Sequence, residues 1–141
     1  YPYGVLERAK RGSWIVVCEG EWDALLVLQH GYQAVTRTGA AKVWNDQEWS
    51  PLFAGLRVVA CHDADQMGVQ GNVRVQAALR GIAKEVRVAR LPYRIRPKHG
   101  KDLTDFILDA DDPGEAIGDL IRSADKKVIT HAYIREGIRT R

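Results

Sequence analysis

Apolar residues along this chain gather in four short runs, which are separated by longer stretches with one apolar and one polar side. The runs predict β-strands, and two of them are apolar at almost every position, as strands buried on both faces are. The strands are predicted at residues 14–20, 33–39, 56–65 and 85–91. The helices are predicted at residues 21–31, 45–55, 68–84, 101–110 and 113–124.

Strands separated by helices of this length predict right-handed βαβ units, and so an α/β fold with about four parallel strands flanked by helices. A chain of 141 residues is expected to form a single core. The predicted domain spans residues 13–124, with residues 1–12 as an N-terminal lead-in and residues 125–141 as a C-terminal tail or linker. The chain begins with Tyr1 rather than Met, which we interpret as a fragment of a longer protein.

The apolar spacing also predicts which helix positions face the core. In the helix at 21–31 it places Ala24, Leu25 and Leu28 on one face. In the helix at 68–84 the residues it makes available for the core are Val69, Val73, Val75, Ala78, Leu79 and Ile82.

Charged residues are unevenly distributed, although the formal net charge is only +3. Residues 63–100 carry eight Lys or Arg against three Asp or Glu, whereas residues 1–62 carry six of each and residues 101–141 carry seven against nine. A basic surface beside carboxylates suits a site that a polyanion must reach. A solvated surface without a ligand explains the same counts, so the charge alone leaves both interpretations open.

Several features argue against other classes of protein. No apolar stretch approaches the roughly 18 residues of a membrane span, and no signal peptide is visible. We therefore expect a cytoplasmic protein with no membrane partner. Cys18 and Cys61 form neither a disulfide framework nor a zinc motif and are expected to be small buried apolar residues. The absence of a P-loop, a Rossmann glycine fingerprint and a nucleophile elbow argues against ATPases, dehydrogenases and hydrolases.

Three carboxylates stand at the ends of two predicted strands. Glu19 ends the first strand, and Asp63 and Asp65 end the third, two residues apart, so that both can face the same side. In a parallel sheet, ligands bind beyond the carboxyl ends of the strands, so we expect the three acids at one edge. Such carboxylates are costly unless they are solvated, paired or bound to a cation. Their hard oxygen ligands predict a site for Mg²⁺ or Mn²⁺ that acts on a phosphate.

Four strings follow one another along the chain: VCEGEWDALLVLQHG, TRTGAA, VVACHDADQMG and GKDLTDFI. In this order they resemble the successive motifs of the Toprim domain, and more narrowly its version in bacterial DNA primases and in phage or plasmid primase-helicases. The resemblance covers residues 13–110 and implies a compact Rossmann-like fold of four parallel strands with flanking helices. The E-G-x-x-D-A-L string followed by D-x-D-x-x-G is fairly specific as a combination.

The resemblance also implies roles for individual residues. The catalytic residues it implies are Glu19, Asp63 and Asp65. The ligands of Mg²⁺ or Mn²⁺ are implied to be Glu19, Asp63, Asp65 and Asp102. Supporting positions are implied at Asp23, Gly39 and Gly68. Contacts to nucleic acid or nucleotide are expected from Lys101, Arg87, Arg90, Arg94 and Arg96. For the arginines, a solvated strand face is the alternative interpretation.

The leading functional hypothesis is the nucleotidyl-transfer domain of a DNA primase, which makes RNA primers on single-stranded DNA. It implies single-stranded DNA and nucleoside triphosphates as partners, and a replicative helicase domain in the same chain as a further one. Primases of this type carry a zinc module and a basic subdomain upstream, and these 141 residues contain neither. The alternatives are a Toprim nuclease or topoisomerase and a non-catalytic Toprim module that binds nucleic acid.

Overall fold

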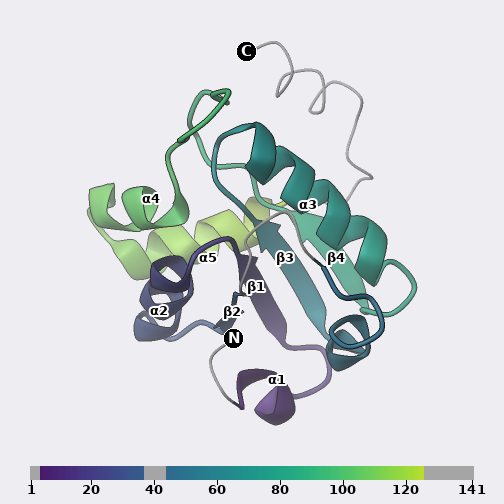
Figure 1. Cartoon of the computed structure of the whole chain (residues 1–141). Coiled ribbons are helices and arrows are strands. Elements are labelled where there is room, and N and C mark those ends of the chain that lie inside the picture. The colour runs from purple at the N-terminus through teal and green to yellow at the C-terminus, as the bar shows by residue number, and fades with distance from the viewer. Residues whose placement is uncertain (1–3, 37–43, 126–141) are drawn as a thin grey trace.

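The computed structural model describes residues 4–36 and 44–125, and within them the strands form one parallel sheet of four strands in the order β2-β1-β3-β4 (Figure 1). The α/β fold with four parallel strands is therefore confirmed. The strand bounds are β1 Trp14–Cys18, β2 Ala34–Val35, β3 Arg57–Cys61 and β4 Glu85–Val88. Each strand ends earlier than predicted: β1 and β3 end before the polar residues that follow Cys18 and Cys61, β2 ends at Val35 and β4 ends at Val88.

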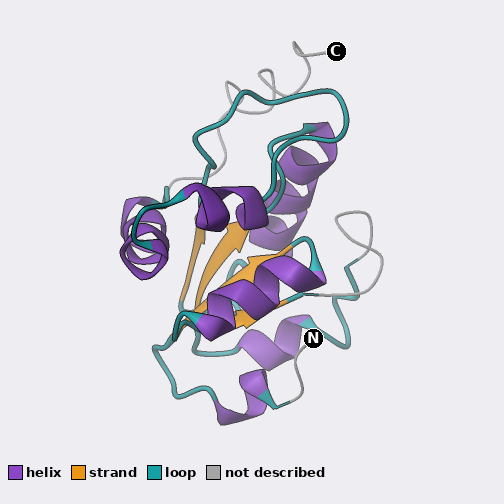
Figure 2. Ribbon diagram, turned by 90° about the vertical axis from the view of Figure 1, so that its left-hand side faces the viewer, coloured by secondary structure: helices purple, strands orange, loops and turns teal. Residues whose placement is uncertain are grey.

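Helices cover both faces of this sheet (Figures 1 and 2). The helices are α1 Val5–Arg8, α2 Glu21–Gln29, the 3₁₀ helix η2 Ser50–Phe53, α3 Gln66–Leu79, α4 Leu103–Asp109 and α5 Pro113–Ser123. Figure 1 shows α3 in front of the strands and α5 behind them. Within the described residues no helix has the length and apolar character needed to cross a membrane.

The core consists of two apolar layers, one on each face of the sheet. Alternate residues of β1 supply them: Ile15 and Val17 pack with α1, η2 and α3, whereas Val16 and Cys18 pack with α2, α4 and α5. Both faces of the strand are therefore covered, which is why its sequence is apolar throughout. Cys61 is buried in the same layer as Cys18, so the prediction that both cysteines are small buried residues is confirmed.

Three local predictions are wrong. The helix expected at 45–55 is reduced to turns and to η2, where Pro51 stands in the first turn because it has no N–H to continue a helix. Leu25 is 51% exposed, because α2 turns Val27 toward the sheet instead. Ile82 is 38% exposed, because α3 ends at Leu79 and the chain then turns.

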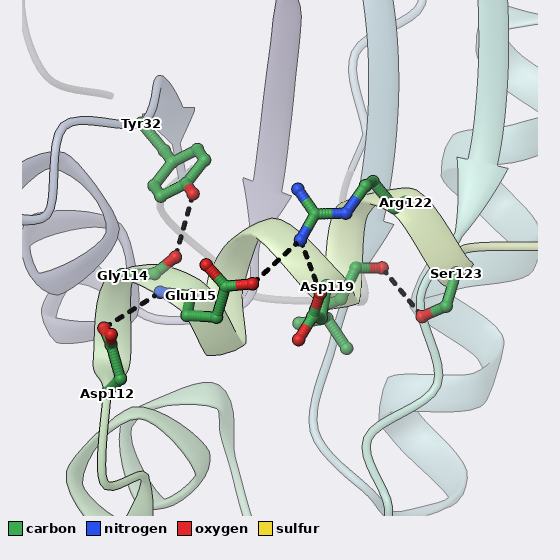
Figure 3. A network of polar contacts seen from close by, with 8 residues as sticks. Tyr32, Asp112, Gly114, Glu115, Asp119, Arg122 and Ser123 are labelled. Atoms are coloured by element: carbon green, nitrogen blue, oxygen red, sulfur yellow. Dashed lines mark hydrogen bonds and ion pairs between the residues drawn. The ribbon is translucent and has the colours of Figure 1, made fainter.

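The carboxyl end of the described chain is held against the sheet. The hydroxyl of Tyr32 donates a hydrogen bond of 2.8 Å to the carbonyl oxygen of Gly114, which ties the loop after α2 to the first turn of α5 (Figure 3). After α5, Asp125 forms an antiparallel bridge with Val88 of β4.

Candidate active site

Three acidic residues converge at the carboxyl ends of β1 and β3. These strands are neighbours, with Cys18 opposite Cys61, so the residues that follow them lie side by side. The backbone N–H of Asp63 donates a hydrogen bond of 2.8 Å to Oε2 of Glu19. The structure thus brings together acids that are 44 residues apart in the chain.

The acids border a partly open cleft with a volume of about 540 Å³. That size is within the range of about 300–1,000 Å³ of small-molecule sites. The cleft is lined by Glu19, Asp63, Asp65, Gln66, Met67, Gln70, Pro97, Lys98 and His99. Two segments distant in the chain, the start of α3 and the loop before α4, therefore form its walls.

Asp65 is buried, and both of its carboxylate oxygens accept backbone hydrogen bonds. Oδ1 accepts from the N–H of Gly68 at 2.8 Å, which makes Asp65 the N-cap of α3. Oδ2 accepts from the N–H of Gly100 at 3.1 Å. Helix α3 thus begins two residues before the predicted Gly68. Asp65 joins the helix to the loop that forms the opposite wall.

Two glycines allow that loop and α3 to approach the backbone around Asp65. A Cβ on Gly68 would lie 1.9 Å from the carbonyl oxygen of Asp63, and a Cβ on Gly100 would lie 2.1 Å from that of Ala64. The N–H of Ala64 also donates to the carbonyl oxygen of Lys101 at 2.8 Å. The short distance gives a structural reason for a glycine at position 68, which was predicted as a supporting position. Gly39 lies outside the described residues.

Asp23 and Asp102 lie beside the cleft rather than in its lining. Asp23 is buried and accepts hydrogen bonds from the N–H of Gly20 at 3.1 Å and from the N–H and hydroxyl of Thr104 at 2.9 and 2.6 Å. Asp102 is the N-cap of α4, where it accepts from the N–H of Asp105 at 2.8 Å. Asp23 therefore fastens the turn after β1 to the start of α4.

The cleft carboxylates repel one another and are poorly solvated. The pKa of Asp63 is raised from 3.8 to about 9, first by burial and then by the charges of neighbouring acids, of which Glu19 is the strongest. Burial also raises the pKa of Glu19, although the hydrogen bond from Asp63 opposes that rise. Burial raises the pKa of Asp102 as well. No ion pair between described residues neutralises Glu19, Asp63 or Asp65.

A divalent metal fits this donor set with a small number of protein ligands. In the part of the chain that is described, no three Asp, Glu, His or Cys side chains form a ready-made metal-ligand group. Glu19, Asp63 and Asp65 all line the cleft, and each carboxylate oxygen of Asp65 also accepts one backbone N–H group, which uses part of its capacity as a ligand. Mg²⁺ is commonly held by one or two carboxylates, with waters and substrate phosphates as the other ligands. A bound cation would favour the charged forms of Glu19 and Asp63, whose pKa values are raised without it.

The cationic residues expected to contact nucleic acid do not gather in one place. Arg90, Arg94 and Arg96 are exposed in the segment after β4, on the way to the cleft. Lys101 is exposed too, with its Nζ 5.1 Å from the centre of the Tyr93 ring.

Arg87 lies elsewhere. Its Nε donates to Glu85 at 2.7 Å, and its guanidinium lies 4.7 Å from the centre of the Trp14 ring, at the start of the strands. The structure does not bring Arg87 to the acidic cleft.

Sequence reasoning did not identify several cleft residues. His99 lines the cleft and has a φ of 53°, a left-handed backbone conformation that is uncommon outside glycine. Gln66 and Gln70 line the wall formed by α3. The only available signal was position, because these residues flank the D-x-D and G-K-D strings. His62, next to Asp63 in the sequence, is not part of the cleft lining: it is buried, with Nδ1 2.7 Å from Oδ1 of Asn72 in α3.

The chain belongs to the Toprim-like family Toprim_2, whose family model matches residues 16–107. The resemblance to the Toprim domain is therefore confirmed. Among curated proteins no match was found.

Two solved structures from bacteriophage T7 are similar to this chain. One is the lagging-strand DNA polymerase interacting with primase domains of two gp4 subunits bound to an RNA/DNA hybrid and dTTP. Its matching chain is 24% identical with a TM-score of 0.61, and the match covers 84% of this chain and 58% of that one. The other is the primase fragment of the primase-helicase protein, 21% identical with a TM-score of 0.57, over 82% of this chain and 46% of that one. This chain spans about half the length of those chains, and the similarity is one of fold.

Proposed function

We propose that this chain is the metal-dependent nucleotidyl-transfer domain of a DNA primase, which adds ribonucleotides to a primer on single-stranded DNA. The observation that carries the proposal is the convergence of Glu19 and Asp63 on a cleft of nucleotide size in a Toprim-like domain, where no cation of residues 4–36 and 44–125 pairs with them. One similar bacteriophage T7 structure contains primase domains bound to an RNA/DNA hybrid and dTTP, and the other is a primase fragment; both support the same class of reaction.

Mg²⁺ or Mn²⁺ would be held by Glu19 and Asp63, while Asp65 fixes the start of α3 against the loop before α4. When bound, the ion would neutralise phosphate charge during transfer. Glu19 has a raised pKa and stands at the cleft, so it is placed to take the proton of the primer hydroxyl. In this proposal Asp102 supports the cleft through the start of α4.

Cations at the mouth of the cleft suit the anionic substrates. Lys98 lines the cleft, and Arg94, Arg96 and Lys101 are exposed in the same segment. Their charges would attract the triphosphate and the template strand, because phosphate contacts position a nucleic acid without reading its sequence.

In the whole protein we propose that residues 13–124 act together with flanking domains. A replicative helicase domain in the same chain is one such partner, as the similarity to a primase-helicase fragment suggests. Residues 1–12 and 125–141 would then be a lead-in and a linker. Of these, Val5 and Leu6 already pack in the core.

The proposal is tested first by metal binding, since the isolated chain need not make primers unaided. Titration with Mn²⁺ should raise the melting temperature of the wild type, and Asp63→Asn should lose most of that rise. Asp111→Asn, which removes an exposed carboxylate in the turn before α5, is the matched control and should behave as the wild type. An equal rise in Asp63→Asn and the wild type would contradict the metal site.

Activity then separates the classes of reaction. The chain, with Mn²⁺ and nucleoside triphosphates, should extend an RNA primer annealed to a DNA template, and Glu19→Gln should reduce the rate by at least about 100-fold. Cleavage of a labelled single strand or relaxation of a supercoiled plasmid, without extension, would instead indicate a nuclease or topoisomerase. Metal binding with neither reaction, even in the full-length protein, would indicate a non-catalytic module.

A further inference from the structure

The edge of the sheet opposite the acidic cleft is formed by three segments, residues 9–13, 54–57 and 80–87, which we call the amino-end rim. Hydrogen bonds join the first two: the N–H of Gly12 donates to the carbonyl oxygen of Gly55 at 2.8 Å. The N–H of Lys84 donates to the carbonyl oxygen of Leu56 at 2.8 Å and so adds the third segment. In Figure 1 these segments lie where β1, β3 and β4 begin.

The amino-end rim is strongly basic. Its only acidic residue is Glu85, and its cationic residues are Lys10, Arg11, Arg57, Arg80, Lys84 and Arg87. This local excess is larger than the formal net charge of +3 of the whole chain, so the rest of the protein is acidic on balance. Positive charge is therefore concentrated at the rim.

Four of these cations are exposed and lack an ion-pair partner among the described residues. Lys10, Arg11, Arg80 and Lys84 are all exposed, and no ion pair between described residues involves any of them. The side chain of Arg11 lies against the segment 54–57: its Nε would be 2.9 Å from a Cβ placed on Gly55.

The remaining two cations, Arg57 and Arg87, are held by contacts with Trp14 and Glu85. The guanidinium groups of Arg57 and Arg87 lie 5.7 and 4.7 Å from the centre of the Trp14 ring. Glu85 is shared between them, 2.7 Å from Nε of Arg87 and 4.0 Å from Nε of Arg57. One carboxylate between two guanidinium groups leaves a net positive charge, and Nε of Arg57 is buried without a hydrogen-bond acceptor.

We propose that the amino-end rim binds the phosphate backbone of single-stranded DNA, without sequence preference, as a contact surface separate from the acidic cleft. When exposed lysines and arginines contact phosphates, they displace the counter-ions condensed on the nucleic acid, and this release is the main source of such binding. A five-residue strand separates the two edges by about 16 Å, so a single strand can be held at the rim without occupying the cleft.

The surface chemistry favours a nucleic acid over an acidic protein segment. Protein interfaces usually have a desolvated centre in which aromatic side chains and arginines pack into pockets of the partner. The rim offers Ile82 alone as an exposed large apolar residue, at 38% exposure. Single-stranded DNA carries one negative charge per nucleotide and can be held through its phosphates without an apolar anchor.

The experiment measures the binding of a fluorescein-labelled 20-nucleotide oligo(dT) by anisotropy across a salt series, in EDTA so that no divalent ion can bridge DNA to the acids. Lys10→Gln/Lys84→Gln removes two positive charges from the rim. Arg122→Glu changes the net charge by the same amount on α5, where Arg122 is exposed and paired with Glu115.

We expect the rim variant to bind several-fold more weakly and its slope of log K against log salt to be smaller by about 1.4, or about 0.7 for each lysine. Arg122→Glu should keep the wild-type slope. An unchanged slope in the rim variant, or an equal loss in both variants, would overturn the proposal. So would competition by polyglutamate as effective as that by unlabelled oligo(dT) of equal charge, which would identify an acidic protein segment as the occupant.

The result does not depend on the proposed function. Asp63→Asn should bind the oligonucleotide in EDTA as tightly as the wild type, because it changes no residue of the rim. A loss of binding in Asp63→Asn would place the DNA at the acidic edge and contradict the rim. Failure of the Mn²⁺ titration would leave this measurement unaffected.

Discussion

The carboxylate of Glu19 accepts a hydrogen bond from the backbone N–H of Asp63, with 2.8 Å between Oε2 and N, across the gap between β1 and β3. This contact follows from the parallel register of Cys18 and Cys61, the last residues of the two strands. It holds two carboxyl groups together in a partly buried place where like charges oppose one another.

The metal-free protein should lose stability as the pH rises from about 4 to about 9. The pKa of Asp63 is 3.8 in an unfolded chain and about 9 in the folded one, so over this range the folded state holds a proton that the unfolded state releases. The free energy of unfolding therefore falls as the pH increases. Urea denaturation in EDTA at several pH values measures this slope. Asp63→Asn should flatten it, and a slope equal to that of the wild type would assign the effect to other groups.

Asp23→Ala should destabilise the fold by about 2 kcal/mol, because it removes a buried acceptor from three donors. The loss is limited by relief of the repulsion between Asp23 and Asp63. Thr104→Val, which removes only the hydroxyl, should cost about 1 kcal/mol. Urea denaturation measures both values, with Asp111→Asn as an exposed control expected to stay within about 0.5 kcal/mol of the wild type. If Asp23→Ala were as stable as that control, Asp23 would not connect α2 to α4.

Gly68→Ala and Gly100→Ala should each destabilise the protein by about 3 kcal/mol or more, because the added methyl group would overlap backbone carbonyl oxygens that cannot rotate away. Gly114→Ala is the matched control, since its Cβ would come no closer than 3.7 Å to a neighbour. It should be neutral or slightly stabilising. Thermal melting of the three variants distinguishes these outcomes. A Gly100→Ala protein that melts with the wild type would show that the loop before α4 is not fixed against Ala64.

The effect of Gly118→Ala on the free energy of unfolding should depend on the residue at position 32: destabilising with Tyr32 and stabilising with Phe. Its Cβ would lie 2.7 Å from the hydroxyl oxygen of Tyr32, which the carbonyl of Gly114 holds in place (Figure 3). In the wild type this overlap should outweigh the gain in helix propensity of about 1 kcal/mol. In a Tyr32→Phe background the overlap is relieved, so Gly118→Ala should become stabilising. A double-mutant cycle by urea denaturation measures the coupling, and additive effects would mean that the two residues do not meet.

Much of the architecture was determined by the sequence alone. The apolar runs predicted the parallel strands, because a strand buried on both faces has no polar side. They also placed Glu19, Asp63 and Asp65 at strand ends, and parallel strands present their carboxyl ends at one edge. Sequence reasoning failed where local pattern competes with packing: Leu25 has the right spacing for the core, but α2 is rotated so that Val27 is buried instead.

The roles of the individual acids were decided by the tertiary structure. Nothing near Asp65 in the sequence predicts that Gly100, 35 residues away, would donate to its second oxygen and give it a structural role as well. The same long-range folding brings His99 into the cleft and holds Arg87 at the other end of the sheet. Periodicity reports which face of an element is buried. Which groups meet across elements depends on hydrogen bonds and charges between segments far apart in the chain, and these exist only once the strands have paired.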